Sequence, residues 1–264
     1  MAPANFAQKR QAAPQAAVPE RMSLSRRVVA EMLGTAFLLA AVVGSGIMGE
    51  RLAGGNIAIA LLANTLATGA ALPTLIFTFG PISGAHFNPA VTLADASQGG
   101  LSWSDALAYM GSQVFGAFIG VGAAHLMFDE ALIQFSQHAR GGGSQVFSEF
   151  IATFGLLCVI WGCVRLRSEV VPIAVGLYIS GAYWFTASTS FANPAVTLAR
   201  AFTDTFAGIR PVDAPGFIIA QFLGAFTATL LFRWLVPSLP SEAKEAVFPQ
   251  IRNVDDPTPP QERV

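Results

Sequence analysis

The chain has 264 residues, of which 53% are hydrophobic and 12% charged, and its mean hydropathy is +0.54. Soluble globular proteins carry about 25% charged residues, so most of this chain is expected to face lipid or protein rather than water. The net charge of −1 gives no reason to expect a nucleic-acid partner. Two cysteines, Cys158 and Cys163, are too few for a disulfide framework or a metal cluster. They lie in an apolar run and are expected to be buried thiols.

The two ends of the chain differ from its middle. Residues 1–27 are rich in Ala, Pro and Gln, end in Arg26 and Arg27, and lack the apolar core of a signal peptide. We expect them to form a disordered cytoplasmic tail. Residues 28–237 are predicted to form one membrane domain, and residues 238–264 a second polar tail on the same side.

Six segments are apolar enough for the roughly 20 residues that a membrane-spanning helix needs. Two further apolar stretches, 88–96 and 193–202, are about half as long. The prediction is therefore an all-α membrane protein with six transmembrane helices and two re-entrant half-helices. The six predicted spans are residues 28–48, 57–79, 106–127, 147–164, 171–190 and 217–236.

The distribution of basic residues predicts the orientation, because cytoplasmic loops are enriched in Lys and Arg. The segments assigned to the inside contain Lys9, Arg10, Arg21, Arg26, Arg27, Arg165, Arg167, Arg233, Lys244, Arg252 and Arg263. The outside loops contain only Arg51, Arg140, Arg200 and Arg210. Both termini are accordingly expected in the cytoplasm, with the protein in the plasma membrane as a multi-pass chain.

The sequence repeats itself across two halves, about 28–139 and 145–237. Glu31 and Glu149 each begin a similar stretch in spans one and four, and the run Asn-Pro-Ala-Val-Thr-Leu-Ala follows both span two and span five. Three spans per half is an odd number, so the halves must be inverted, which is typical of proteins whose site lies near the bilayer midplane. The segment 140–143, Arg-Gly-Gly-Gly, is expected to be a flexible joint between them.

The two repeated motifs, Asn88-Pro89-Ala90 and Asn193-Pro194-Ala195, each predict a helix start. Asn is a good N-cap, and Pro is favoured in the first turn. One half-helix enters from each side, so the starts should meet near the membrane centre, where irregular backbone is tolerated only beside a cavity or inside protein. Each start carries about half a positive charge. A pore there would repel cations and pass neutral hydroxyl-bearing solutes.

Three titratable residues lie within the predicted membrane domain close to these motifs or to their loops. Glu31 and Glu149 are acids within apolar spans, which is costly unless they are paired; we expect each to accept hydrogen bonds from the backbone N–H groups of a half-helix loop. A proton relay is the alternative for both. His86 could titrate, although a structural hydrogen bond in its loop is favoured.

These motifs resemble those of the major intrinsic proteins, the aquaporins and aquaglyceroporins, over about residues 27–237. The resemblance rests on both Asn-Pro-Ala motifs, on the segment 83–86 (Ser-Gly-Ala-His) before the first, and on Glu31 and Glu149. It implies a homotetramer in membrane lipid, with one pore per subunit, that conducts water, glycerol, urea or metalloid hydroxides without ion flow. No cofactor, catalytic residue or metal site is expected.

The resemblance also implies a selectivity filter on the outer side, at Thr68, Gly181, Ser190 and Val196. A shift by one residue would place Ala182 instead of Gly181. Water channels usually carry Phe at the first of these positions and His at the second, and most members carry Arg at the fourth. Small residues here predict a wider constriction that donates few hydrogen bonds.

Arg200 follows Val196 by one helical turn, and Asp95 holds the mirrored position in the first half. Arg200 is a candidate for the outer mouth of the pore, and Asp95 for the inner mouth. A surface ion pair for each, or a snorkelling arginine, is the alternative. Asp204 lies one turn beyond Arg200 and could neutralise it.

The run 193–209 looks like that of bacterial aquaglyceroporins associated with arsenic resistance, which implies passage of neutral arsenous acid. A channel for glycerol, urea or water alone stays open, as does an ion-coupled transporter. An enzyme is the least favoured class, because Tyr109, Tyr178, Tyr183, His125 and His138 form no recognisable catalytic set.

Overall fold

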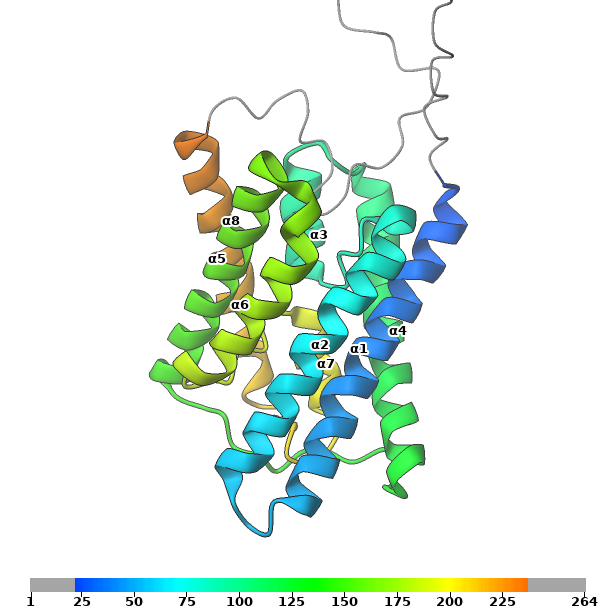
Figure 1. Ribbon diagram of the computed structural model, residues 1–264, viewed down its shortest axis with the longest axis vertical. Helices are drawn as coiled ribbons and strands as arrows, with labels where there is room; N and C mark the ends of the chain where they lie inside the picture. Colours follow the sequence, from blue (N-terminus) through cyan, green and yellow to red (C-terminus); the bar gives the residue numbers. More distant parts are fainter. Residues whose placement is uncertain (1–21, 237–264) are drawn as a thin grey trace, which may run out of the picture. The chain divides into compact units, whose positions relative to one another are not determined.

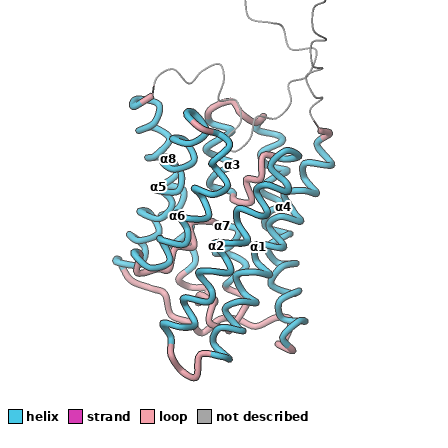
Figure 2. The backbone as a smooth tube through the Cα atoms, in the orientation of Figure 1, coloured by secondary structure: helices cyan, strands magenta, loops and turns pink. Residues whose placement is uncertain are grey.

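Helices make up the regular structure of residues 22–236, the part of the chain that the structure, a computed structural model, describes (Figure 2). The long helices are α1 (Leu24–Leu52), α2 (Ile57–Ser83), α4 (Trp103–Phe128), α5 (Gly143–Leu166), α6 (Val171–Phe185) and α8 (Ala214–Leu235). The short ones are α3 (Pro89–Ser97), α7 (Pro194–Arg200) and the 3₁₀ turn η1 (Ser168–Val170). This is the predicted order of elements.

Five of these helices, α1, α2, α4, α5 and α8, are long and apolar enough to cross a membrane. Helix α6 has 15 residues and ends at Phe185, before the predicted end at residue 190. The residues that follow it are polar and bond locally: the Thr186 hydroxyl donates to the carbonyl of Ala182, and the Ser188 hydroxyl accepts the amide of Ser190. These bonds turn the chain into the loop that leads to α7.

The predicted N-terminal tail is also too long in its last residues. Helix α1 already begins at Leu24, and Arg27 is buried, with its guanidinium 2.8 Å from the carboxylate of Asp105 in α4. Residues 1–21 and the predicted C-terminal tail lie outside the described residues.

Within each half, close helix contacts depend on small residues. A Cβ atom at Gly116 or Gly120 of α4 would lie 2.2 Å from a carbonyl oxygen of α1, that of Met32 or Ala36. In the second half, a Cβ at Gly224 of α8 would lie 2.5 Å from the carbonyl oxygen of Phe150 in α5. Small residues at such crossings allow the backbones of membrane helices to approach.

The two short helices lie between the long ones (Figure 1). Helices α3 and α7 contact each other, and each also packs against both α4 and α8. Helix α2 packs against α6, which joins the two halves on the other side. The half-helices are thus held at the boundary between the repeats.

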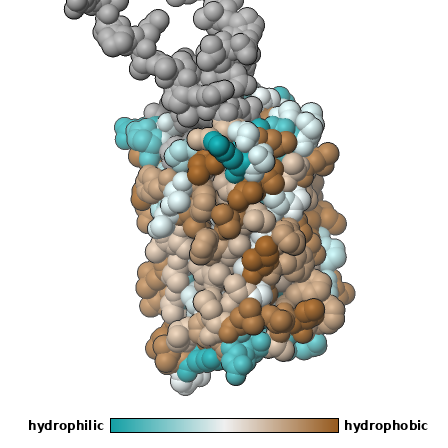
Figure 3. Space-filling model, turned by 90° about the vertical axis from the view of Figure 1, so that its right-hand side faces the viewer, coloured by the Kyte–Doolittle hydropathy of each residue, from teal (hydrophilic) through white to brown (hydrophobic). Residues whose placement is uncertain are grey.

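The outer surface is apolar through its middle. In Figure 3 brown side chains cover the central part of the visible face, and hydrophilic residues gather toward its two ends. Large apolar side chains such as Phe37, Phe115, Leu177 and Phe226 are more than half exposed. Apolar exposure on this scale is expected of a surface that faces lipid or a partner subunit.

Candidate functional site

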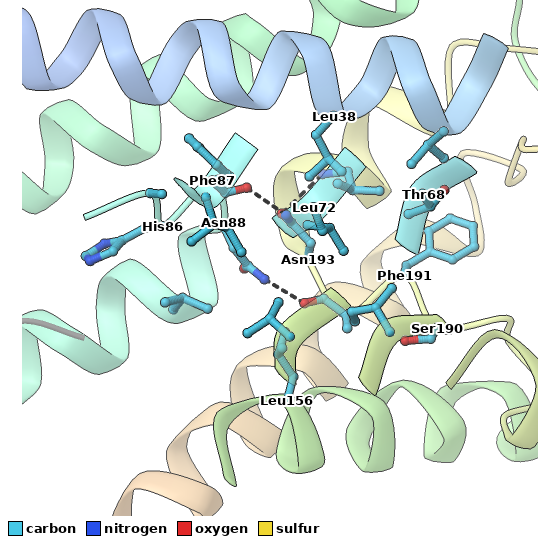
Figure 4. A pocket seen from close by; sticks show the side chains of 18 of the residues that line it. Leu38, Thr68, Leu72, His86, Phe87, Asn88, Leu156, Ser190, Phe191 and Asn193 are labelled. Carbon is cyan, nitrogen blue, oxygen red and sulfur yellow. Dashed lines mark hydrogen bonds between the residues drawn. The ribbon is translucent and has the colours of Figure 1, made fainter. Parts of the chain in front are cut away.

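Two asparagines cap the half-helices and tie them together. The side-chain oxygens of Asn88 and Asn193 accept backbone N–H groups two residues further on, at 2.9 Å and 3.0 Å. The Asn88 amide donates to the carbonyl of Ala192, and the Asn193 amide donates to the carbonyl of Phe87, both at 2.7 Å (Figure 4). Each asparagine therefore links its own helix start to the loop that precedes the other one.

Those two loops have the same unusual backbone. Ala85 and Phe87 have φ values of 49° and 48°, and Ser190 and Ala192 have 51° and 46°. Residues other than glycine rarely adopt these left-handed values, at a cost of roughly 1–3 kcal/mol each. They recur at equal distances from the two asparagines, so both halves hold the same strained turn.

Glu31 holds the first loop from α1. It is fully buried, and its carboxylate accepts the Ser83 hydroxyl at 2.6 Å, the amides of His86 and Phe87 at 3.0 Å and 2.7 Å, and the Gln113 side chain at 2.7 Å. A buried carboxylate is tolerated when its lone pairs are filled in this way. The bonds fix the loop ahead of Asn88.

Glu149 of α5 holds the second loop in the same manner. Its carboxylate accepts the amides of Phe191 and Ala192, both at 2.8 Å, and the side chain of Gln221 at 2.6 Å. Every donor here is a neutral N–H group. The geometry is that of a structural support for the loop ahead of Asn193.

A cavity runs past the two asparagines. Aliphatic side chains from the long helices form one part of its wall, among them Leu38, Leu72, Leu156, Val175 and Ile179. The asparagine amides and the two loops supply polar groups to the other part. Each amide has two N–H donors and one recorded acceptor within residues 22–236, which leaves a donor for a solute.

Different side chains line the two ends of this cavity. Figure 4 shows His86 at one end, which we call the α3 mouth, and Thr68, Ser190 and Phe191 at the other, the α7 mouth. The two asparagines lie between them. A solute that crossed the cavity would pass from one mouth to the other beside both helix starts.

The α7 mouth is bridged by a hydrogen bond between two helices. The hydroxyl of Tyr183 in α6 donates to the hydroxyl of Thr68 in α2 at 3.3 Å, and both side chains are buried and line the cavity. Ser190 and Val196 line the cavity as well. Three of the four predicted filter residues therefore face the cavity.

Gly181 does not. It is exposed on the outer face of α6, where a Cβ would meet only the ring of Phe185, at 3.9 Å. The cavity side of α6 carries Val175, Ile179 and Tyr183, spaced four residues apart. The predicted placement of Gly181 was wrong, and the aromatic ring of Tyr183 replaces the expected small residue.

Arg200 lies at the α7 mouth and is 2% exposed. Its Nε donates to the carbonyl of Ala207, and its guanidinium carbon lies 3.4 Å from the centroid of the Phe191 ring. In residues 22–236 Asp204 forms no salt bridge with it; the Asp204 carboxylate accepts the backbone amide of Gln137 at 2.8 Å. The predicted neutralisation of Arg200 by Asp204 was wrong.

At the α3 mouth, His86 is buried and held on two sides. Its Nδ1 lies 3.1 Å from the Thr92 hydroxyl, and its Nε2 lies 3.8 Å from the carboxylate of Asp95. Asp95 is 1% exposed and is not part of the cavity wall. The predicted inner-mouth acid therefore sits behind His86 rather than in the solute path.

The sequence model of the Major intrinsic protein family matches residues 19–192 and 166–255. The chain belongs to the major intrinsic protein family. Members are membrane channels for small solutes, not enzymes, and no cluster of metal-binding side chains is present in residues 22–236.

Relatives within the family extend over most of the chain. It is 56% identical over 217 residues to "Aquaglyceroporin AqpS" of Rhizobium meliloti (strain 1021), covering 82% of this chain and 93% of that protein. It is 34% identical over 187 residues to "Aquaporin NIP1-3" of Oryza sativa subsp. japonica, covering 68% and 64%. The structure of the aquaglyceroporin from Plasmodium falciparum matches with a TM-score of 0.65 at 22% identity, covering 81% of this chain and 98% of that one. That likeness shows the fold.

Two glutamines were missed in the sequence of this major intrinsic protein. Gln113 of α4 and Gln221 of α8 are fully buried; besides their glutamates, they donate to the hydroxyls of Thr92 and Thr197 at 2.9 Å and 2.8 Å. Each links a long helix, a glutamate and a half-helix. The sequence signal that could have identified them is a polar amide side chain within an otherwise apolar span.

The segment 140–143, predicted to be a flexible linker between the halves, is held in place at its first residue. Arg140 is 8% exposed, and its guanidinium donates to the carbonyl of Gly208 at 2.7 Å and that of Phe206 at 3.2 Å. The expectation of flexibility was wrong there, because these acceptors come from a segment far away in sequence. No local pattern in the sequence marked this residue.

Proposed function

We propose that the chain is a passive channel for water, glycerol and small metalloid hydroxides such as arsenous acid, and that it excludes ions. The observation that carries the proposal is the meeting of two helix starts, capped by Asn88 and Asn193, beside one cavity. Helix N-termini present partial positive charge and N–H donors. They favour neutral solutes with oxygen acceptors and disfavour cations.

The wall of the cavity suits solutes with one polar and one apolar side. Aliphatic chains from α1, α2, α5 and α6 face the asparagine amides across the path. Glycerol has a carbon backbone along one side and hydroxyls along the other, so both parts of the wall would be matched. Arsenous acid is neutral near pH 7, rich in hydroxyls and of similar size.

The proposed filter consists of Thr68, Tyr183, Ser190 and Val196, with Arg200 beside it. Val196 contributes bulk without charge, and the Tyr183–Thr68 bond contributes hydroxyl groups. Such a filter offers solutes the hydroxyls of Thr68, Tyr183 and Ser190 beside the guanidinium of Arg200. The relative from Rhizobium meliloti, which is named an aquaglyceroporin, supports a filter that admits more than water.

The arrangement in the membrane is proposed from the same sources. The arginine distribution places both termini and the α3 mouth inside the cell, and the α7 mouth outside. The exposed apolar surface (Figure 3) is available to lipid and to neighbouring subunits of a homotetramer in the plasma membrane.

Uptake into proteoliposomes tests the proposal. Purified protein is reconstituted, and stopped-flow light scattering compares water, glycerol and arsenous acid uptake with that of protein-free vesicles. We expect faster uptake of all three solutes than in protein-free vesicles. Each solute should move only down its own concentration gradient. Uptake no faster than in protein-free vesicles contradicts the channel; accumulation of solute driven by a proton gradient indicates the coupled transporter instead.

A further inference from the structure

Arg140, from the loop between α4 and α5, is buried against Phe191, just outside the cavity wall at the α7 mouth. Its guanidinium donates to the carbonyls of Gly208 (2.7 Å), Ser188 (3.3 Å) and Phe206 (3.2 Å), and to the hydroxyl of Thr189 (3.4 Å). All four acceptors are neutral oxygens, and together they use most of the five N–H donors of the side chain. These hydrogen bonds fix the position of the Arg140 guanidinium but do not neutralise its positive charge.

The carboxylates near this charge, Asp213 and Glu149, form no salt bridge with it. Asp213 accepts the backbone amide of Arg140 at 2.9 Å but pairs with the side chain of Arg210 at 3.0 Å. These contacts lower the pKa of Asp213 although its partial burial raises it. Glu149 accepts only neutral donors, the amides of Phe191 and Ala192 and the side chain of Gln221, so it keeps its charge. Burial lowers the pKa of Arg140 more than the attraction of Glu149 raises it. In residues 22–236 neither Arg140 nor Arg200 takes part in a salt bridge.

Arg140 remains a cation under physiological conditions. Burial lowers its pKa to about 10, which is still well above neutral pH. A buried cation without a counterion is costly, and ionisable groups with strongly perturbed pKa values concentrate at functional sites. Four fixed carbonyl and hydroxyl dipoles make this one tolerable.

Both arginines contact the same aromatic ring. The guanidinium carbons of Arg140 and Arg200 lie 5.1 Å and 3.4 Å from the centroid of Phe191, and the Phe191 ring lines the cavity. Arginine stacks favourably on aromatic faces. Phe191 therefore holds two positive charges close to the solute path at the α7 mouth. Val196, at the same mouth, carries no charge.

We propose that Arg140 and Arg200 together form the barrier against cations and protons at the α7 mouth, with Arg140 as a specificity-determining residue contributed by the loop between the repeats. This deepens the proposed channel function and rests on it. Charges in a water-poor constriction act more strongly than at an open surface. A cation that approached Phe191 from this mouth would be repelled by the guanidinium of Arg200 on the cavity wall and by that of Arg140 just outside the wall.

The two arginines contribute in different ways to the proposed barrier. Arg140 has its donors occupied by the protein, so it contributes charge rather than contacts with the solute. Arg200 has one recorded acceptor in the described chain, the Ala207 carbonyl at its Nε. Its terminal N–H groups are left to bond hydroxyls that pass through the mouth.

Proton leak measured beside glycerol uptake tests this inference. Vesicles containing a pH-sensitive dye are given a potassium gradient with valinomycin, and proton entry is divided by the glycerol flux of the same preparation. Variants are Arg140→Gln, which removes the charge, and Arg140→Lys, which keeps it. Arg51→Gln is the matched control, because Arg51 is half exposed and paired with Glu130 at 2.9 Å.

In Arg140→Gln we expect the ratio of leak to glycerol flux to rise about tenfold, equivalent to about 1.4 kcal/mol of barrier. Arg140→Lys and Arg51→Gln should stay near the wild-type ratio. A wild-type ratio in Arg140→Gln overturns the inference. So does Arg140→Lys leaking as much as Arg140→Gln, since geometry rather than charge would then matter. A wild-type protein that admits no glycerol overturns the proposed channel function instead.

Discussion

Val196 follows the second Asn-Pro-Ala motif and lines the cavity without carrying a charge. The nearest cation on its own helix is Arg200, one turn further on. The position of the charge therefore differs from the position that the family pattern suggests. The consequences are testable one side chain at a time.

Val196→Arg should restrict the pore and reduce glycerol and arsenous acid uptake before water uptake. A guanidinium is longer than the valine side chain, and it would also be repelled by Arg200 at i+4. Stopped-flow comparison of the three solutes provides the measurement. Val196→Leu, which adds bulk without charge, is the control; unchanged glycerol uptake in Val196→Arg would contradict the assignment of this residue to the filter.

Tyr183→Phe removes the hydroxyl that bonds Thr68 at 3.3 Å and leaves the aromatic ring in place. We expect glycerol uptake to rise relative to water uptake, because the bridge between α6 and α2 is lost. Stability should fall by about 0.5–1.5 kcal/mol, the usual net value of one hydrogen bond.

The control for that variant is Tyr178→Phe. The Tyr178 hydroxyl bonds the Ala152 carbonyl at 3.0 Å, and the side chain is not part of the cavity wall. It should lose similar stability and keep the wild-type ratio of glycerol to water uptake. Equal ratios in both variants would remove Tyr183 from the filter.

At the scale of elements, the half-helices depend on long helices that come very close together. Helix α4 meets α1 at Gly116 and Gly120, and the same helix carries Gln113, which bonds Glu31. A displacement of α4 would move the support of the first loop. The packing of α1 on α4 and the position of Asn88 are therefore coupled.

Gly116→Ala should destabilise the protein strongly, because the new Cβ would lie 2.2 Å from the Met32 carbonyl oxygen. Overpacking of this kind typically costs about 1–3 kcal/mol. Gly111→Ala in the same helix is the matched control, since nothing lies within 4 Å of its Cβ. Size-exclusion profiles after heating in detergent measure both, and equal melting temperatures would show that the crossing is looser than described.

At the scale of the whole molecule, the inverted halves predict that the two mouths open on opposite sides of the membrane. Leu52, after α1, and Ser104, at the start of α4, are exposed near opposite ends of the helix bundle. The arginine distribution predicts that the first lies outside the cell and the second inside.

Labelling of single cysteines tests this orientation. In a background with Cys158 and Cys163 replaced by Ser, an impermeant maleimide added to intact cells should label Leu52→Cys and not Ser104→Cys. Both should react after the cells are lysed, which is the control for accessibility. The reverse pattern in intact cells would invert the protein and assign the α7 mouth to the cytoplasm.

The amino-acid sequence by itself determined the repeated features. Apolar length predicts the spans, and the duplicated Asn-Pro-Ala run with Glu31 and Glu149 predicts two inverted helix starts, because each signal is local and occurs twice. It could not determine which way a side chain points within an apolar helix. Gly181 and Tyr183 are two residues apart and face opposite sides of α6, since each residue turns the helix by about 100°.

Only the tertiary structure decided where the positive charge lies. The partners of Arg140 are carbonyls from residues 188–208, and its glycine neighbours gave the local sequence the character of a flexible joint. Backbone carbonyls are the same in every residue, so the sequence carries no mark of which ones meet a distant guanidinium. Long-range folding brings them together, and with them the second arginine at Phe191.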